Sequence, residues 1–288
     1  MTVVAVGLYV SDHYLYVDRL PEPGESIEVS HHIVADGGKA ANQAAASALQ
    51  GAITYLIASI GDDEAGHTGL TALAGYGVET SRIDNVVGAR TGMSSILLAP
   101  DGTQMVATFA GAGARITTES VHASLRGLTP TVALLQGETG GALSLELAAS
   151  GIAATVILDP SPADWFAGRK LTGVDILTPN LQEARILTSG TAPTSTNLAA
   201  RTGVKRVIIT KGSGGAETYD NGVVTHLPGI IVDVTDSTGA GDAFNGALAA
   251  ALDHGTPFME AAEHALHAAA WSVTRPYCMA SYPTKEQL

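Results

Sequence analysis

The sequence predicts an α/β protein in which helices cover both faces of a mostly parallel central sheet, with a small second β-sheet beside it. Four short apolar runs, TVALLQ, ATVILDP, DILTPN and RVIITKG, each end in polar or turn residues and are separated mostly by helical patterns. This alternation is typical of a parallel sheet between two helical layers. Two other stretches, 13–35 and 91–109, alternate polar and apolar residues around the turns Pro23-Gly24 and Asp101-Gly102. They predict antiparallel strands with one face in water, which together form the small sheet.

The remaining elements follow from local patterns. Glycine and turn dipeptides mark where helices and hairpins end. The expected order is a strand at 3–10, a helix at 39–50, a strand at 52–61, a helix at 69–78, a hairpin at 216–227, and a helix that carries Phe244, Leu248 and Leu252 on one face. No internal repeat or linker interrupts this order, so one domain is expected over 1–288.

Composition narrows the classes of partner and compartment. The net charge is −13 and no basic run exists, so we expect no nucleic-acid or anionic-membrane partner. A phosphate group must then be bound locally, by backbone N–H groups, a few cations or a metal. Cys278 is the single cysteine, which excludes a disulfide framework within one chain and suits a reducing cytoplasm. No apolar run reaches about 18 residues and the first residues lack a basic leader, so a cytoplasmic protein without a membrane partner is predicted.

Polar residues follow several of the predicted strands. In parallel sheets, ligands bind at the carboxyl ends of the strands. The residues placed there are Asp12, Glu138, Asp159, Asn180 and Lys211.

Two glycine-rich stretches could approach a ligand closely. In DGGKAANQ the pair Gly37-Gly38 precedes a strong helix with Asn42 near its start, and such a helix start offers N–H donors. In ITKGSGGAE, from 209 to 217, a strand ends in Thr210 and Lys211 before further glycines. That stretch does not match the P-loop pattern. In both cases a plain turn explains the glycines about as well.

Asn180 and Glu183 stand three residues apart at the start of a helix, so their side chains share one face. This pair could help to hold hydrated Mg²⁺ and a phosphate. The alternative is a capping box, in which Asn180 caps the helix and Glu183 returns a bond to the cap.

The stretch DSTGAGDAFNGAL has the clearest chemical meaning. Glycines at a helix N-terminus form an anion site, and Asp242 closes this one. A carboxylate beside an anion site makes sense where a base takes a proton from a hydroxyl while N–H groups stabilise a transferred phosphoryl. The alternative is that Asp242 only caps the helix.

These stretches, in this order, resemble the ribokinase-like (PfkB) family of carbohydrate kinases over nearly the whole chain. The resemblance is carried by GGKAANQA at 37–44, the N-x-x-E pair at 180–183 and DSTGAGDAFNGAL at 236–248. Within the group, GGK-x-ANQA, PxPGE at 21–25 and HAAAWSVTR at 267–275 look closest to ribokinases. The family implies one kinase domain with a three-layer α/β/α fold, in which 13–35 and 91–109 form a β-sheet lid that often pairs subunits as a homodimer.

The resemblance also implies an ATP-dependent sugar kinase and a role for each matching position. Asp242 would be the catalytic base, and the backbone of Gly239, Ala240 and Gly241 the anion hole. The sugar pocket would be lined by Val10, Asp12, Gly38, Lys39, Asn42, Glu138 and Asp242. Mg²⁺, phosphate and nucleotide would be held by Asn180, Glu183, Thr210, Lys211, Gly212, Ser213, Gly215, Gly241 and His267. A monovalent cation, K⁺ by analogy, would be bound by Asp236, Thr238, Ser272, Arg275, Tyr277 and Ser281, several through backbone carbonyls.

Two departures from ribokinases affect these assignments. Ribokinases carry an Asn where this chain has Val10, and a valine offers no hydrogen bond to a hydroxyl. A deoxyribose or nucleoside kinase is therefore the first alternative to a ribose kinase. The tail RPYCMASYP also differs from the usual R-x-G-A-Q, which bears on the cation loop and on His267. The alternative from another class is a sugar-binding regulatory protein without catalysis, which the intact motifs disfavour.

Overall fold

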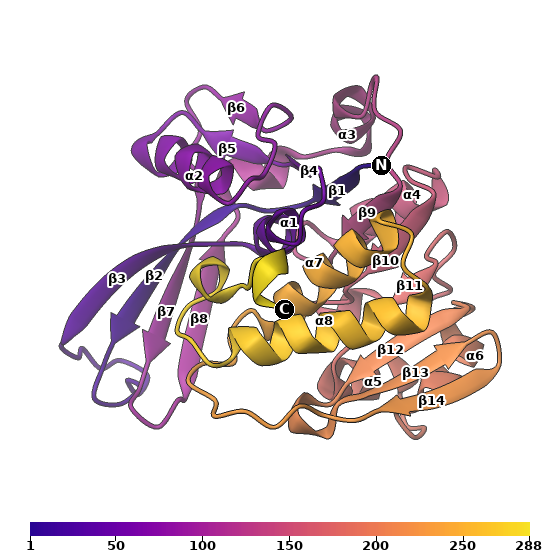
Figure 1. Ribbon diagram of the computed structural model, residues 1–288. Helices are drawn as coiled ribbons and strands as arrows, with labels where there is room; N and C mark the ends of the chain where they lie inside the picture. The colour runs from indigo at the N-terminus through magenta and orange to yellow at the C-terminus, as the bar shows by residue number, and fades with distance from the viewer.

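The computed structural model describes residues 1–288 and contains an eight-stranded central sheet with helices on both faces (Figure 1). Its strands follow the order β14-β13-β12-β11-β10-β9-β1-β4. All neighbours from β12 to β4 are parallel, and β13 and β14 add an antiparallel edge. The strand bounds are β1 Val3–Val6, β4 Thr54–Ile57, β9 Val132–Leu135, β10 Thr155–Leu158, β11 Ile176–Leu177, β12 Arg206–Thr210, β13 Ala216–Asp220 and β14 Val223–Leu227.

Two hydrophobic clusters fill the space on either side of this sheet. Alternate residues of a strand point to opposite faces, so Val3 and Ala5 of β1 join one cluster while Val4 and Val6 join the other. The first cluster contains α1 (Lys39–Leu49), α7 (Ala240–Asp253) and α8 (Phe258–Ser272). The second packs beneath α3 (Thr118–Ser124), α4 (Gly141–Ala149), α5 (Leu181–Thr188) and α6 (Ser195–Thr202). The predicted three-layer α/β/α architecture is therefore confirmed.

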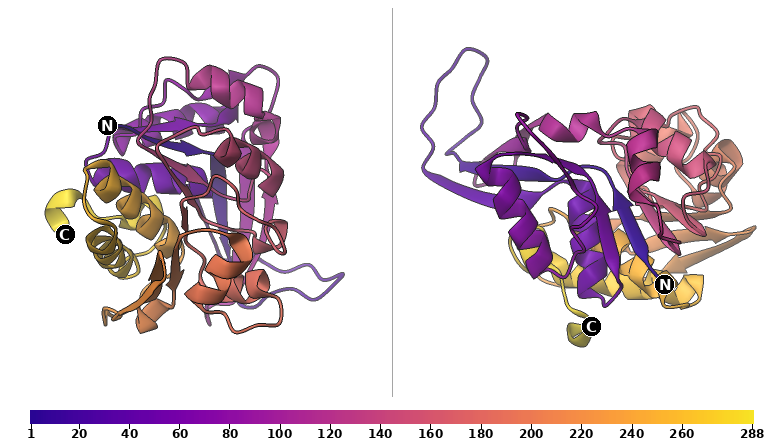
Figure 2. Two further views of the ribbon diagram at one scale, coloured as in Figure 1. Left: turned by 90° about the vertical axis from the view of Figure 1, so that its right-hand side faces the viewer. Right: turned by 90° about the horizontal axis from the view of Figure 1, so that it is seen from above.

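The small sheet has the order β3-β2-β7-β8 and extends away from the body of the molecule (Figure 1). Its strands are β2 Val10–Tyr16, β3 His31–Gly37, β7 Gly92–Leu98 and β8 Gln104–Phe109. The β7–β8 hairpin turns at Asp101-Gly102, where Gly102 has a φ of 84°. The connection between β2 and β3 contains no regular element and projects as a long loop (Figure 2).

Two expected single strands are each divided between sheets. The run 3–10 splits into β1, in the central sheet, and the start of β2, in the small sheet. The run 52–61 splits into β4 and β5 (Ser59–Gly61), and β5 pairs with β6 (Asp84–Val86). Both runs stay buried after they change sheet. Apolar periodicity reports burial, so it could not show these breaks.

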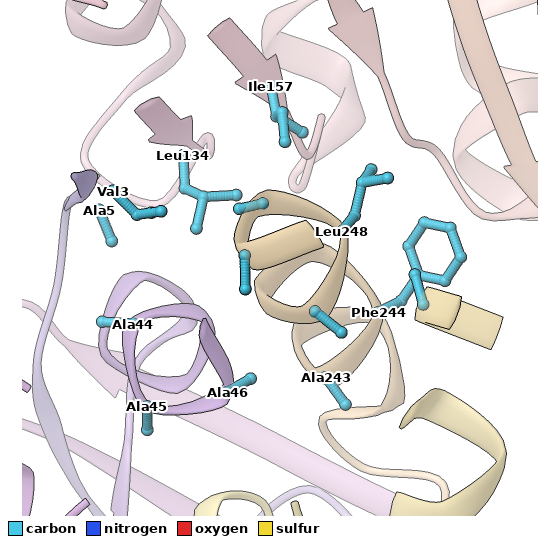
Figure 3. Packing of buried hydrophobic residues seen from close by; sticks show 14 of the residues in the cluster. Val3, Ala5, Ala44, Ala45, Ala46, Leu134, Ile157, Ala243, Phe244 and Leu248 are labelled. Carbon is cyan, nitrogen blue, oxygen red and sulfur yellow. The ribbon is translucent and has the colours of Figure 1, made fainter. Parts of the chain in front are cut away.

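Helices α1 and α7 pack through small side chains next to the central sheet, and Ala46 is on the side of α1 that faces α7 (Figure 3). A β-carbon at Gly246 would lie 2.4 Å from Cβ of Ala46 and 2.6 Å from the carbonyl oxygen of Gln43. This close approach brings the first turns of the two helices together. Helix α2 (Glu64–Gly75) begins at the cap Asp63, as its side chain accepts a hydrogen bond from Gly66 N. None of the helices combines the length and apolar content needed to cross a bilayer.

Candidate active site

Asp242 lies in the first turn of α7 and is buried. Both of its carboxylate oxygens accept hydrogen bonds from α1: Asn42 Nδ2 donates to Oδ2 and Gln43 Nε2 donates to Oδ1, each at 3.0 Å. The ammonium group of Lys39 is 3.9 Å from Oδ1. Three polar side chains of one helix therefore fix the orientation of this carboxylate.

Paired glycines allow α1 to start beside the lid. Gly38 has a φ of 91°, and a β-carbon there would lie 2.6 Å from the carbonyl oxygen of Leu8. A β-carbon at Gly37 would lie 2.0 Å from Oδ2 of Asp12. Larger residues would displace Asp12 or the start of α1, so both glycines are needed for this geometry.

Acceptor groups gather next to Asp242. The pKa of Asp12 is raised to about 6 and that of Glu138 to about 7; burial is the largest cause of each rise, and the charge of Asp242 contributes to both. Glu138 Oε2 accepts a hydrogen bond from the backbone N–H of Lys39 at 2.8 Å. Oδ1 of Asn42 is buried and has no hydrogen-bond partner. A ligand with several hydroxyl groups would satisfy such a set of acceptors.

Free backbone donors lie at the start of α7. Gly239 caps the helix with a φ of 75°, and a β-carbon there would lie 2.6 Å from the Tyr282 hydroxyl. The N–H of Ala240 donates to the carbonyl oxygen of Ser237 at 3.3 Å, while those of Gly241 and Asp242 have no acceptor in the protein. An anion bound here would therefore be held mainly by the last two groups.

A groove of about 260 Å³ borders the start of α7, where these donors lie. Its walls are mostly apolar and come from the end of β12, the loop before α7, and helices α7 and α8. The residues that line it include Thr210, Gly212, Ser213, Gly215, Ile230, Val232, Gly241, Phe244, Leu266 and Ala270. Gly241 lines this groove, and the next residue, Asp242, is hydrogen-bonded to Asn42 and Gln43 of α1.

Residues 1–285 match the family described as pfkB family carbohydrate kinase. The chain belongs to this family. It is 32% identical over 297 residues to a ribokinase of Haemophilus influenzae, covering 99% of this chain and 96% of the relative. It is 28% identical over 304 residues to a deoxyribokinase of Salmonella typhi, covering 100% and 97%. The structure of Arabidopsis thaliana ribokinase complexed with ribose and ATP matches with a TM-score of 0.83 and 28% identity, covering 99% of this chain and 96% of that one. The predicted family, fold and enzyme class are confirmed: the protein is a carbohydrate kinase.

The structure places two expected nucleotide residues of this kinase outside the groove. The amine of Lys211 points to Glu217, with which it forms an ion pair at 2.8 Å, and Lys211 does not line the groove. His267 is exposed on α8, and Leu266 lines the groove in its place. Adjacent residues on a helix point about 100° apart, so a shift of one position moves a side chain off the wall.

Asn180 and Glu183 of the kinase form the capping box. Oδ1 of Asn180 accepts from the N–H groups of Gln182 and Glu183, and Oε2 of Glu183 accepts from the N–H of Asn180 at 2.8 Å. Oε1 of Glu183 accepts no hydrogen bond in the cap. The charge of Glu183 raises the pKa of both Lys39 and Asp159. The pair is thus a cap, and Glu183 also faces the active site.

The residues expected at a monovalent cation join two loops of the kinase. Asp236 accepts hydrogen bonds from the N–H of Thr238 at 2.9 Å and from the N–H of Tyr277 at 3.1 Å. Tyr277 has a φ of 67°, a strained conformation for a bulky residue. The other side chains bond elsewhere: Ser272 to Ala269, Ser281 to Cys278, and Arg275 to the face of Trp271. Asp236 is the only carboxylate among these six residues, so it is the one whose charge would attract a cation.

Two glutamines near Asp242 were not assigned to the site from the sequence, and Asp159 was placed at the ligand-binding end of the sheet without a role. Gln43, Gln136 and Asp159 are buried, and Gln43 is hydrogen-bonded to Gln136, to Asp159 and to the Asp242 carboxylate. The one signal for Asp159 is its place after a strand. Gln43 lies within the GGKAANQA stretch but no role was drawn from it, and nothing local marks Gln136, because the partners in these bonds lie about a hundred residues away in the chain.

Proposed function

We propose that this kinase transfers the γ-phosphoryl group of ATP to a hydroxyl of a small ribose-like sugar, with Asp242 as the base. The observation that carries the proposal is the position of Asp242 between two sites. On one side lie the acceptor groups of Asp12, Asn42 and Glu138, and on the other lie the free N–H donors next to the groove.

Each part has a chemical task. The carboxylates and the free Asn42 oxygen accept hydrogen bonds from the sugar hydroxyls and place one hydroxyl at Asp242. Asp242 removes its proton as the bond to phosphorus forms. The N–H groups of Gly241 and Asp242 stabilise the charge on the transferred phosphoryl. Lys39 neutralises part of the negative charge that the site would otherwise collect.

ATP fits the groove by its chemistry. The apolar walls from Ile230 to Val232, with Leu266 and Ala270, would cover a base, and the backbone of Gly212 to Gly215 would follow the phosphates. Mg²⁺ would be held near Glu183, whose Oε1 is not used by the cap, and would neutralise phosphate charge. K⁺ would be held by Asp236 and nearby carbonyls, where it would fix the loop before α7.

A deoxyribose or nucleoside substrate is a second candidate, favoured by Val10. This side chain is 3% exposed and apolar, so it cannot bond a hydroxyl at that wall of the pocket. A site without that bond discriminates weakly against a sugar lacking the hydroxyl. Val10→Asn should raise kcat/KM for ribose relative to 2-deoxyribose.

We also propose that the lid forms a homodimer contact. The outward face of the small sheet carries Val34, Met93, Met105 and Phe109, all of which are exposed. An exposed apolar sheet face of this kind suits burial against a second copy. Light scattering should give twice the chain mass, and Phe109→Asp should give a monomer.

The test of the main proposal is turnover on ribose, 2-deoxyribose, ketohexoses, adenosine and pseudouridine, with coupled detection of ADP. Each reaction is run with K⁺ and with Na⁺ and with Mg²⁺ or EDTA. We expect Mg²⁺-dependent turnover of a pentose, faster in K⁺. No sugar-dependent ADP release with any substrate would contradict the proposal and would support a binding protein without catalysis.

A further inference from the structure

A single amide group joins two buried carboxylates at the start of α1. Gln43 Nε2 donates to Asp159 Oδ2 at 2.9 Å and to Asp242 Oδ1 at 3.0 Å. The amide nitrogen has two hydrogens, so each carboxylate receives one. The separation and orientation of Asp159 and Asp242 are therefore linked through this group.

A hydrogen bond from Gln136 fixes which way the Gln43 amide faces. Gln136 Nε2 donates to Gln43 Oε1 at 2.7 Å. Because only the oxygen of Gln43 can accept this bond, the nitrogen must face the carboxylates. Gln43 and Gln136 are almost completely buried, so water does not compete for these bonds.

Lys39 contacts the same two carboxylates. Its ammonium group is 3.5 Å from Asp159 Oδ2 and 3.9 Å from Asp242 Oδ1. The closer contact is with Asp159, which draws the positive charge away from the base. Without Asp159, Lys39 would pair with Asp242 alone and would oppose its uptake of a proton.

Asp159 is an unfavourable residue for stability at this position. Burial raises its pKa to about 7; the charge of Lys39 opposes this rise, and the charges of Asp242 and Glu183 add to it. The charged and polar groups that face Asp159 are Lys39 and Gln43 on α1, Asp242 on α7 and Glu183 on α5. A neutral asparagine would fill the same space without the cost of burying a charge.

We propose that Asp159 is a positioning residue for phosphoryl transfer: its carboxylate holds the Gln43 amide and the Lys39 ammonium, and through them fixes Asp242 for proton removal. This inference rests on the proposed function of Asp242. It adds a second buried carboxylate, which acts on Asp242 through Gln43 and Lys39.

The raised pKa of Asp159 makes folding stability depend on pH, and the direction of this dependence follows from the shift. Because the pKa of Asp159 is raised on folding, the folded state holds this proton more tightly than the unfolded state. Asp159 therefore lowers stability progressively as the pH rises from about 4 to about 7, the range between the ordinary Asp value and the folded one. Asparagine removes this dependence.

The test compares Asp159→Asn with wild type and with the control Asp253→Asn. Asp253 is also a buried carboxylate, at the opposite end of α7 from Asp242. At pH 8 we expect Asp159→Asn to raise Tm, to lower kcat about tenfold or more, and to leave the sugar KM within about twofold. The Tm gain should shrink at pH 5. In wild type we expect kcat to rise through about pH 7 as Asp159 ionises, and in Asp159→Asn this rise should be absent.

A double variant shows whether Asp159 acts through Gln43. Gln43→Met keeps the length of the side chain and removes its hydrogen bonds. We expect the variant with both changes to lose about as much kcat as the worse single variant. Losses that multiply would show that the two residues act independently and would contradict the proposal.

A crystal structure of Asp159→Asn tests the positioning without turnover. We expect the distance from Gln43 Nε2 to Asp242 Oδ1 to exceed 3.5 Å, or Lys39 to move onto Asp242. An unchanged arrangement overturns the inference even if the wild type proves inactive on every sugar. An active wild type with unchanged kcat in Asp159→Asn overturns the inference and leaves the proposed function standing.

Discussion

Gly246→Ala should separate the two helices that build the active site. The new β-carbon would lie 2.4 Å from Cβ of Ala46, 2.6 Å from the carbonyl oxygen of Gln43 and 2.7 Å from N of Ser47. Carbon atoms in contact need about 3.5–4.0 Å, so α1 and α7 must move apart by about 1 Å. Overpacking of this kind costs about 1–3 kcal/mol of folding free energy.

The same movement affects catalysis. The hydrogen bonds that orient Asp242 are 3.0 Å long and cross the interface between these helices. A further 1 Å breaks them, and a misplacement of that size can cost about a hundredfold in rate. We therefore expect kcat for Gly246→Ala to fall by about that factor, measured by coupled ADP release, together with a lower Tm.

Gly75→Ala is the matched control, because a β-carbon there meets nothing within 4 Å. It should leave kcat unchanged and hold or raise Tm, since alanine favours helix. If Gly246→Ala were as active as Gly75→Ala, the contact between α1 and α7 would not position the base.

Three further predictions concern the loop, the sugar pocket and the groove. Gly239→Ala should lower kcat at least about a hundredfold, because its β-carbon would lie 2.6 Å from the Tyr282 hydroxyl and its φ is 75°; a rate near that of wild type would refute this. The kcat/KM for the sugar should fall as pH drops through about 6, because Asp12 must be ionised to accept sugar hydroxyls; in Asp12→Asn this limb should be absent, and its persistence would assign it elsewhere. Lys211→Ala should leave the KM for ATP within about twofold, because its amine pairs with Glu217; a large rise would restore Lys211 to the nucleotide site.

Short motifs predicted the parts of the site that depend on backbone conformation. Gly38 and Gly239 both have positive φ, and each stands where the sequence placed a glycine-rich turn before a helix. The capping box at Asn180, one of the two interpretations that its spacing left open, is present. Such features are local, so a short stretch contains the information that determines them.

Features that depend on distant partners could not be predicted in this way. Leu266 and His267 differ by one helical position, and only the packing of α8 decides which of them faces the groove. Lys211 is turned away by Glu217 on the next strand. The link from Asp159 to Asp242 through Gln43 joins the end of β10 to α1 and α7.

Turnover by Asp242→Asn is the most direct test of the central claim. Asparagine has nearly the same shape and cannot take a proton from a hydroxyl, so folding and sugar binding should be retained. We expect kcat with the best sugar to fall by a factor of about 10² to 10⁴, with Tm within a few degrees of wild type. A folded variant that binds the sugar and turns over within about threefold of wild type would contradict the assignment of Asp242 as the base.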